Sequence, residues 1–305
     1  MSLQTALRST TFIIFCIIVT VSIAMHLILR SDIDGSAILY VGIPTVVAGL
    51  LLLTDKKQPG TTWKSQTFRV MKYSLIVMLA SSAILFEGFL CVVMFMPIYF
   101  GIILIISFVR MAYEHSKSRN RLHFHILPLI LVVAALEGTH PDLSFNRYNE
   151  VTSTKTVNLS VEQIKQNLIK PVSLDQNRHW FLALFPMPYQ FDATSLTEGE
   201  VHTVYYRYHR WFVTNTHEGF TKMKVAEASD KKIVMQTLED TSYTSNYINA
   251  KGTQIDLTAI DASTTEVKLT IKYERLLDPA WYFDPLQRYA SGLLGDYLIG
   301  IMIER

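Results

Sequence analysis

The longest apolar run in the chain, YSLIVMLASSAILFEGFLCVVMFMPIYFGIILIISFV, extends from Tyr73 to Val109 and contains a single charged residue, Glu87. A helix rises about 1.5 Å per residue and the hydrocarbon core of a bilayer is about 30 Å thick, so this run is too long for one crossing. We predict two membrane helices, 72–88 and 90–109, that turn at Glu87 and Gly88. Glu87 is then a hairpin residue at the interface, or alternatively a functional carboxylate within the membrane.

Three further apolar runs predict three further spans. The first, Thr11–Leu29, carries no charge and has about the length that a crossing needs; no small-residue cleavage site follows it, which argues against a cleaved signal peptide. The runs 37–53 and 122–137 contain Pro44 and Pro128, which a helix bundle tolerates. Residues 1–137 therefore predict a membrane α-helical bundle of about five spans, 11–29, 37–53, 72–88, 90–109 and 122–137.

Lysine and arginine are concentrated in two of the predicted connections. They are Lys56, Lys57, Lys64, Arg69 and Lys72 in one, and Arg110, Lys117, Arg119 and Arg121 in the other. Short loops rich in these residues stay in the cytoplasm. Both loops lie on one side only if the run from Tyr73 to Val109 crosses twice. We therefore expect an integral plasma (inner) membrane protein with a cytoplasmic N-terminus, whose residues 138–305 are extracytoplasmic, or periplasmic in a bacterium.

Composition excludes several classes of partner. The net charge is only +2, so no nucleic-acid partner is implied. Cys16 and Cys91 lie in apolar runs and offer neither a disulfide nor a metal framework. The cluster His115, His123 and His125 lacks further ligands at close spacing. We predict no metal and no cofactor.

From Asn146 onward the pattern is that of a polar α+β domain. Ser160, with Gln163 three residues later, has the spacing of a capping box and predicts a helix that ends before Pro171. A second short helix is predicted over Gln176–Phe185, and the sequence PMP ends it.

Six segments then predict antiparallel strands. They are 200–214, 219–228, 231–240, 241–249, 253–261 and 264–277, with the sequence AKG read as a turn between the fourth and fifth. The last segment alternates strictly, with Val267, Leu269, Ile271 and Tyr273 on one face, which is typical of a sheet with one buried side. The inner face of 200–214 stays open between Tyr205/Arg207/His209/Trp211 and Tyr206/Tyr208/Arg210/Phe212, because both sets mix aromatic and polar groups.

The chain ends in a predicted amphipathic helix, Leu286–Ile303. Its apolar stripe runs through Leu286, Tyr289, Ala290, Leu293, Leu294, Tyr297, Leu298 and Ile301. Asp296 lies off the stripe and would be costly near a bilayer centre. A helix docked on the sheet fits this pattern, and a sixth membrane span is the alternative.

The element order and the junction YERLLDPAWYFDPLQRYASGLLGDYL resemble the START/polyketide cyclase-like (SRPBCC, Bet v 1-like) superfamily over about Arg147 to Ile303. This resemblance implies a helix-grip domain over residues 138–305, in which a curved antiparallel sheet packs on a long C-terminal helix. It carries no catalytic motif, and the superfamily includes lipid-transfer proteins, cyclases and hydroxylases, so the fold alone does not fix an activity.

The resemblance favours a module that binds a lipid or another hydrophobic small molecule near the membrane surface. The expected partners are membrane lipids and this small molecule, and the sequence specifies no protein partner. The residues expected to line its cavity are Tyr206, Trp211, Ile255, Leu257, Leu269, Ile271, Tyr273, Leu286, Tyr289, Leu293 and Tyr297. One alternative is a cyclase-like or hydrolase-like enzyme whose base comes from His202, His209, His217, Glu198, Glu218 or Asp240. The other is a regulatory or interaction protein without a ligand. We predict no catalytic residue.

Overall fold

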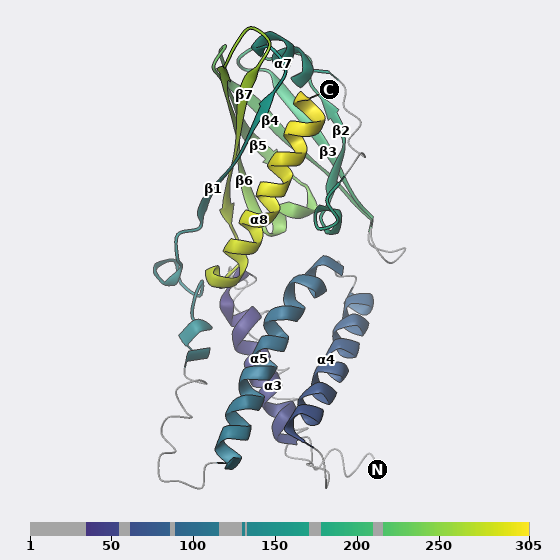
Figure 1. The fold of residues 1–305 in the computed structure, drawn as a ribbon. Coiled ribbons are helices and arrows are strands. Elements are labelled where there is room, and N and C mark those ends of the chain that lie inside the picture. Colours follow the sequence, from purple (N-terminus) through teal and green to yellow (C-terminus); the bar gives the residue numbers. More distant parts are fainter. Residues whose placement is uncertain are drawn as a thin grey trace. The chain divides into compact units, whose positions relative to one another are not determined.

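The computed structural model consists of two compact units (Figure 1). One comprises Met1–Phe145 with Leu277–Pro279, and the other comprises Asn146–Leu276 with Ala280–Arg305. The structure describes residues 35–54, 62–85, 89–115, 130–131, 133–170, 178–209 and 216–304. The predicted span 11–29, most of the span 122–137, and the residues Glu87, Trp211, His123 and His125 lie outside this part of the chain.

The first unit is helical. A short π-helix, η2 (Ile38–Gly42), continues into α3 (Ile43–Thr54), and α4 (Trp63–Leu85) and α5 (Phe89–His115) follow. The run from Tyr73 to Val109 thus contributes to two helices, whose Ser74 and Tyr99 hydroxyls are 3.3 Å apart. Within the described residues, one stretch, Val93–Ala112 with a mean hydropathy of 2.1, is long and apolar enough to cross a membrane by length and composition alone.

Helix α4 differs from the prediction at its start. It begins at Trp63, whereas the sequence predicted a span from residue 72 preceded by a basic loop. Lys64, Arg69 and Lys72 therefore lie in the first three turns of a helix. Lysine and arginine can occupy these positions in an apolar helix, because their long aliphatic side chains let the charged group reach water.

The segment Leu277–Pro279 belongs to the helical unit although it lies late in the sequence. The backbone N–H of Asp278 donates to the Gly35 carbonyl at 2.5 Å. The Ser144 hydroxyl donates to Asp278 Oδ2 at 3.2 Å. Asp278 is fully buried, so these bonds offset part of the cost of removing its polar groups from water.

The second unit is a seven-stranded antiparallel sheet that carries a long helix on one face (Figure 1). The strands are β1 (Tyr148–Val157), β2 (Met187–Asp192), β3 (Val201–His209), β4 (Thr216–Ala228), β5 (Lys232–Asp240), β6 (Ile248–Ala259) and β7 (Thr265–Arg275). Their order in the sheet is β1-β7-β6-β5-β4-β3-β2. The chain therefore forms a meander from β2 to β7, and β1 closes against β7.

Two errors in the predicted strands compensate for each other. Strand β2 begins at Met187, within the PMP sequence that was expected only to end a helix; the predicted helix before it is a single 3-10 turn, η5 (Leu182–Leu184). The predicted strand 241–249 is instead a 3-10 turn, η6 (Tyr243–Asn246), followed by the start of β6. Strand β6 also runs straight through AKG, where a register shift between Ala250 and Gly252 marks a β-bulge and not a turn.

The helix predicted from the capping box is confirmed as α7 (Val161–Leu168). The Ser160 hydroxyl accepts a hydrogen bond from the Gln163 backbone N–H, and the Gln163 side chain accepts one from the Ser160 backbone. Ile164 and Leu168 are the buried face of this helix and pack into the core of the sheet. Two otherwise unpaired N–H groups are thus bonded at the point where the chain leaves β1.

The C-terminal helix docks on the sheet as predicted, but a row of residues beside the predicted stripe is the most deeply buried. Helix α8 (Ala280–Leu298) extends into a π-helical turn, η7 (Ile299–Ile303). Six buried positions recur every four residues, at Phe283, Gln287, Ser291, Gly295, Ile299 and Ile303, and Tyr297 of the predicted stripe is buried as well. A Cβ at Gly295 would lie 2.6 Å from Ser153 Oγ, and that hydroxyl donates to the Gly292 carbonyl at 3.1 Å. Small residues let α8 approach β1 closely, which a search for apolar periodicity does not detect.

Candidate functional site

The face of the sheet that carries α8 is its inner face, and the strand register assigns residues to it. Val225 is fully buried in the core, so its neighbours at two-residue intervals in β4, including Thr221 and Gly219, also point inward. These two residues pair with Val204 and Tyr206 of β3. The question that the sequence left open for β3 is therefore resolved, with His202, Val204, Tyr206 and Tyr208 facing inward.

The outer face of β3 is held by a different set of contacts. Arg207 Nε donates to Glu218 Oε1 at 2.9 Å, and the Arg207 guanidinium lies 4.8 Å from the centre of the Tyr189 ring. Tyr205 points the same way and contacts the Tyr189 ring, with 6.4 Å between ring centres. These exposed contacts occupy Glu218, which was a candidate base.

Three of the predicted cavity-lining residues lie in a filled core. Ile255, Leu257 and Leu269 are all buried and pack together at one end of the inner face. Ile299 and Ile303, from the last turns of the chain, cover them. These residues stabilise the unit by burial, at about 1.5–3 kcal/mol for each fully buried aliphatic side chain.

The other predicted lining residues have varied surroundings. Ile271, Leu286 and Leu293 are partly buried. Tyr297 packs with Leu182 of η5 and with Met187, the first residue of β2. Tyr289 is 53% exposed, and its ring lies 5.3 Å from that of Phe181. Their contact with a ligand stays a prediction.

A chain of polar groups lies beside this apolar surface on the inner faces of β3, β4 and β5. The Thr221 hydroxyl donates to Asp240 Oδ1 at 3.0 Å, and the Ser242 backbone N–H donates to the same oxygen at 2.9 Å. Burial raises the pKa of Tyr206 to about 12, while a hydrogen bond with the Thr221 side chain lowers it and the charge of Asp240 raises it. Tyr206 is therefore a neutral phenol at physiological pH.

An aromatic stack borders this polar chain. The Tyr208 and Tyr243 rings are stacked with 4.9 Å between their centres, and His217 stacks on Tyr243 at 4.8 Å. Tyr247 meets the edge of the Tyr243 ring at 5.6 Å. Because Tyr208 pairs with His217 across β3 and β4, the turn that carries Tyr243 is fixed over two adjacent strands.

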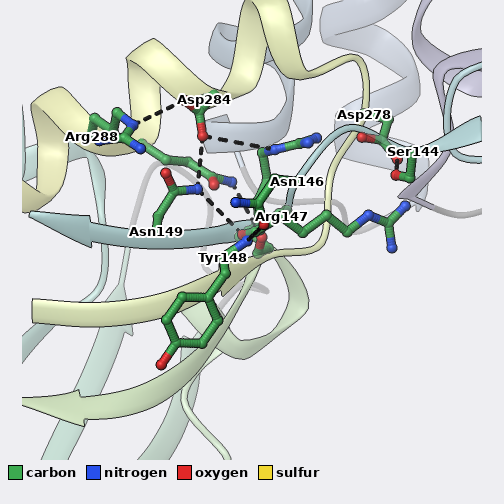
Figure 2. A network of polar contacts seen from close by, with 11 residues as sticks. Ser144, Asn146, Arg147, Tyr148, Asn149, Asp278, Asp284 and Arg288 are labelled. Carbon is green, nitrogen blue, oxygen red and sulfur yellow. Dashed lines mark hydrogen bonds and ion pairs between the residues drawn. The ribbon is translucent and has the colours of Figure 1, made fainter. Parts of the chain in front are cut away.

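A second polar cluster ties the beginning of α8 to the sheet (Figure 2). Asp284 Oδ1 accepts a hydrogen bond from Asn149 Nδ2 at 2.7 Å and lies 4.0 Å from Arg275 Nε. Asp284 Oδ2 accepts from Arg288 Nε, one turn along the helix, at 2.9 Å. Asn149 and Arg275 are buried, and Tyr273 beside them has a pKa raised by burial. This cluster is a structural clamp that the sequence analysis did not identify.

Three of the candidate acid–base residues, His202, Asp240 and Glu218, have separate contacts. His202 is buried, and its Nε2 lies 2.6 Å from the Ser195 carbonyl. Asp240 is bonded to Thr221, and Glu218 is on the outer face with Arg207. Within the residues that the structure describes, no group of three His, Cys, Asp or Glu side chains could hold a metal ion.

The strand order, the short helices between β1 and β2, and the long helix after β7 give the second unit the helix-grip architecture that the sequence resemblance implies. No protein-family model matches the chain, and no curated protein matches its sequence.

Several solved structures are similar to this part of the chain. A START superfamily protein from Mycobacterium smegmatis is 12% identical with a TM-score of 0.34, and the match covers 50% of this chain and 92% of that one. The Zhui aromatase/cyclase from Streptomyces sp. R1128 is 14% identical with a TM-score of 0.33, over 50% and 92% of the two chains. Norcoclaurine synthase from Thalictrum flavum is 10% identical with a TM-score of 0.31, over 50% and 85%. These likenesses carry no argument about activity, and the fold assignment follows from the topology.

Proposed function

We propose that the helix-grip unit binds a hydrophobic small molecule between the inner face of its sheet and α8. We further propose that the helices of residues 1–137 hold it in the plasma membrane, with the N-terminus in the cytoplasm and the unit at the extracytoplasmic surface. The fold family binds hydrophobic small molecules. The apolar stretch Val93–Ala112 supports the attachment to the membrane.

The observation that supports ligand binding is the uneven packing of the inner face. Its core end is filled, with Val267 fully buried and Leu269 nearly so. Val204 and Ile271 point to the same side of the sheet but stay partly exposed. An apolar guest that covered them would gain about 25 cal/mol for each Å² removed from water.

The test uses one strand and both of its faces. The full chain is purified from membranes, and the apolar molecules that accompany it are quantified by mass spectrometry. Val204→Trp adds bulk to the inner face, and we expect it to lose the bound molecule. Val201→Trp is the matched control, because Val201 is 42% exposed and points to the opposite face. Wild-type protein without any bound apolar molecule, or equal retention in both variants, would contradict the proposal.

A further inference from the structure

Helix α4 has two sides with different surroundings in the helical unit. Gln66, Thr67, Val70 and Ser74 are buried, and the Ser74 hydroxyl lies 3.3 Å from the Tyr99 hydroxyl of α5. An α-helix turns about 100° per residue, so these four positions lie on one side of α4. The opposite side is the one that the rest of the described unit leaves uncovered.

This uncovered side carries two lysines and a phenylalanine over the first three turns of the helix. Lys64, Phe68 and Lys72 follow one another at intervals of four residues, which places them in one row, called the basic row below. Phe68 is 70% exposed, and both lysines are exposed as well. Helix α4 contains no acidic residue, so no carboxylate of the same helix neutralises the two ammonium groups.

The same side of α4 continues from the basic row into apolar side chains. Ile76 and Leu79 follow Lys72 at helical spacing and are 52% and 42% exposed. The part of α4 after Lys72 has no charge and is about 20 Å long, whereas the hydrocarbon core of a bilayer is about 30 Å thick. In a helix that crosses the bilayer, Lys72 therefore starts below the head groups, and its aliphatic chain carries the ammonium group to them. Side chains tilt toward the N-terminus of a helix, which for Lys72 is the direction of the head groups.

A phospholipid fits this side of α4 better than a dissolved anion does. A phosphate ion from water would meet the lysines and leave Phe68, Ile76 and Leu79 uncovered. A phospholipid that lies along the helix brings its phosphate to the lysines and its acyl chains to the apolar side chains. An anionic phospholipid also carries a net charge opposite to that of the basic row, and such lipids attract lysine near the membrane surface.

We propose that the basic row binds the head group of an anionic phospholipid, whose acyl chains lie along Ile76 and Leu79. This inference rests on the proposed function, because it requires residues 1–137 to lie in a membrane. In that arrangement the first turns of α4 are on the cytoplasmic side, so the lipid belongs to the cytoplasmic leaflet, which carries the anionic lipids.

Trp63 provides a reporter for the test, because Lys64 Nζ lies 5.9 Å from the centre of its ring. The full chain is reconstituted in phosphatidylcholine vesicles that contain a fixed share of phosphatidylglycerol or phosphatidylcholine brominated near the head group. Bromine quenches tryptophan fluorescence on contact. Each protein is measured with its Trp63→Phe counterpart, and the difference isolates the emission of Trp63. In the wild type we expect phosphatidylglycerol to associate about fivefold more strongly than phosphatidylcholine at physiological salt.

Substitutions assign this preference to the two lysines. Lys64→Gln and Lys72→Gln should each lower the ratio about twofold, and together they should bring it close to one. Lys64→Arg combined with Lys72→Arg keeps both charges and should retain the preference, which separates loss of charge from misfolding. Lys224→Gln is the matched control, because it makes the same change in charge at an exposed lysine of β4 and should leave the ratio unchanged.

The outcomes separate this inference from the proposed function. If neither brominated lipid quenches Trp63, α4 does not meet the bilayer, and the proposed attachment to the membrane fails with the lipid site. If both lipids quench Trp63 equally, α4 lies in the membrane without a preference for anionic head groups, and only the lipid site is wrong. An unchanged ratio in the double glutamine variant, or its loss in the double arginine variant, would also overturn the assignment to the charge of these lysines.

Discussion

Asp284 bonds the beginning of α8 to the sheet. It accepts a hydrogen bond from Asn149 and stands 4.0 Å from the fully buried Arg275. Asp284→Ala removes this carboxylate and leaves a buried guanidinium beside a buried amide. We expect the free energy of unfolding of this unit to fall by about 3 kcal/mol. Pulse proteolysis of the full chain in increasing urea measures this change.

A second aspartate on the same helix provides the control. Asp296 is exposed, so Asp296→Ala should change the free energy of unfolding by less than about 0.5 kcal/mol. A loss of stability as large in Asp296→Ala as in Asp284→Ala would show that the clamp has no special role. Sequence reasoning could not find this clamp, because Asn149 and Asp284 lie 135 positions apart and only the fold brings them together.

At the scale of elements, the bulge in β6 lets us predict the effect of a substitution at Gly252. Gly252 has φ +143°, and a Cβ added there would overlap the Met235 carbonyl of β5. Gly252→Ala therefore combines backbone strain with a clash that no side-chain movement relieves. We expect it to cost about 3 kcal/mol and to accelerate amide hydrogen exchange across β5 and β6.

Gly199→Ala is the control that separates the cost of backbone strain from the cost of the steric clash. Gly199 also has a positive φ, +93°, but an added Cβ meets no atom within 4 Å. Strain alone should cost about 1 kcal/mol, and the exchange rates of β5 and β6 should stay unchanged. Equal effects of the two substitutions would mean that the close approach of β5 to Gly252 is unimportant.

The same elements show where sequence patterns succeed. The capping box at Ser160 and the strict alternation from Val267 to Tyr273 are local signals, and α7 and β7 form as they predict. Strand β2 was not predicted because it contains Pro188. An edge strand such as β2 tolerates proline, because one of its sides needs no ladder hydrogen bonds. Gly252 was read as a turn, although glycine in a strand also marks a bulge.

The candidate site could be predicted only in part, because local alternation orients some strands and not others. Alternation identified the inner side of β7, where the inward residues are apolar. It could not orient β3, since both of its faces mix aromatic and polar side chains. The pairing of Tyr206 with Gly219 settles the orientation, and that pairing depends on the whole sheet.

At the scale of the whole molecule, the basic residues of α4 bear on the proposed sidedness. Lys64, Arg69 and Lys72 occupy the first turns of this helix. If α4 crosses a bilayer, these residues reach the interface at its beginning, and lysine and arginine at a helix end favour the cytoplasmic side. The end of α5 carries Arg110, so the two helices share one basic side.

Reporter fusions in a bacterial host test this arrangement. A fusion after Thr61 or Lys117 should be active as a fluorescent protein, which requires the cytoplasm, and inactive as alkaline phosphatase, which requires export. A fusion after Arg305 should show the reverse. Thr61 and Lys117 on opposite sides would mean that α4 and α5 together cross the membrane once, because an even number of crossings returns the chain to its starting side. A cytoplasmic Arg305 alongside a cytoplasmic Lys117 would instead remove the crossing proposed for residues 122–137, and the helix-grip unit would then meet its ligand at the inner leaflet.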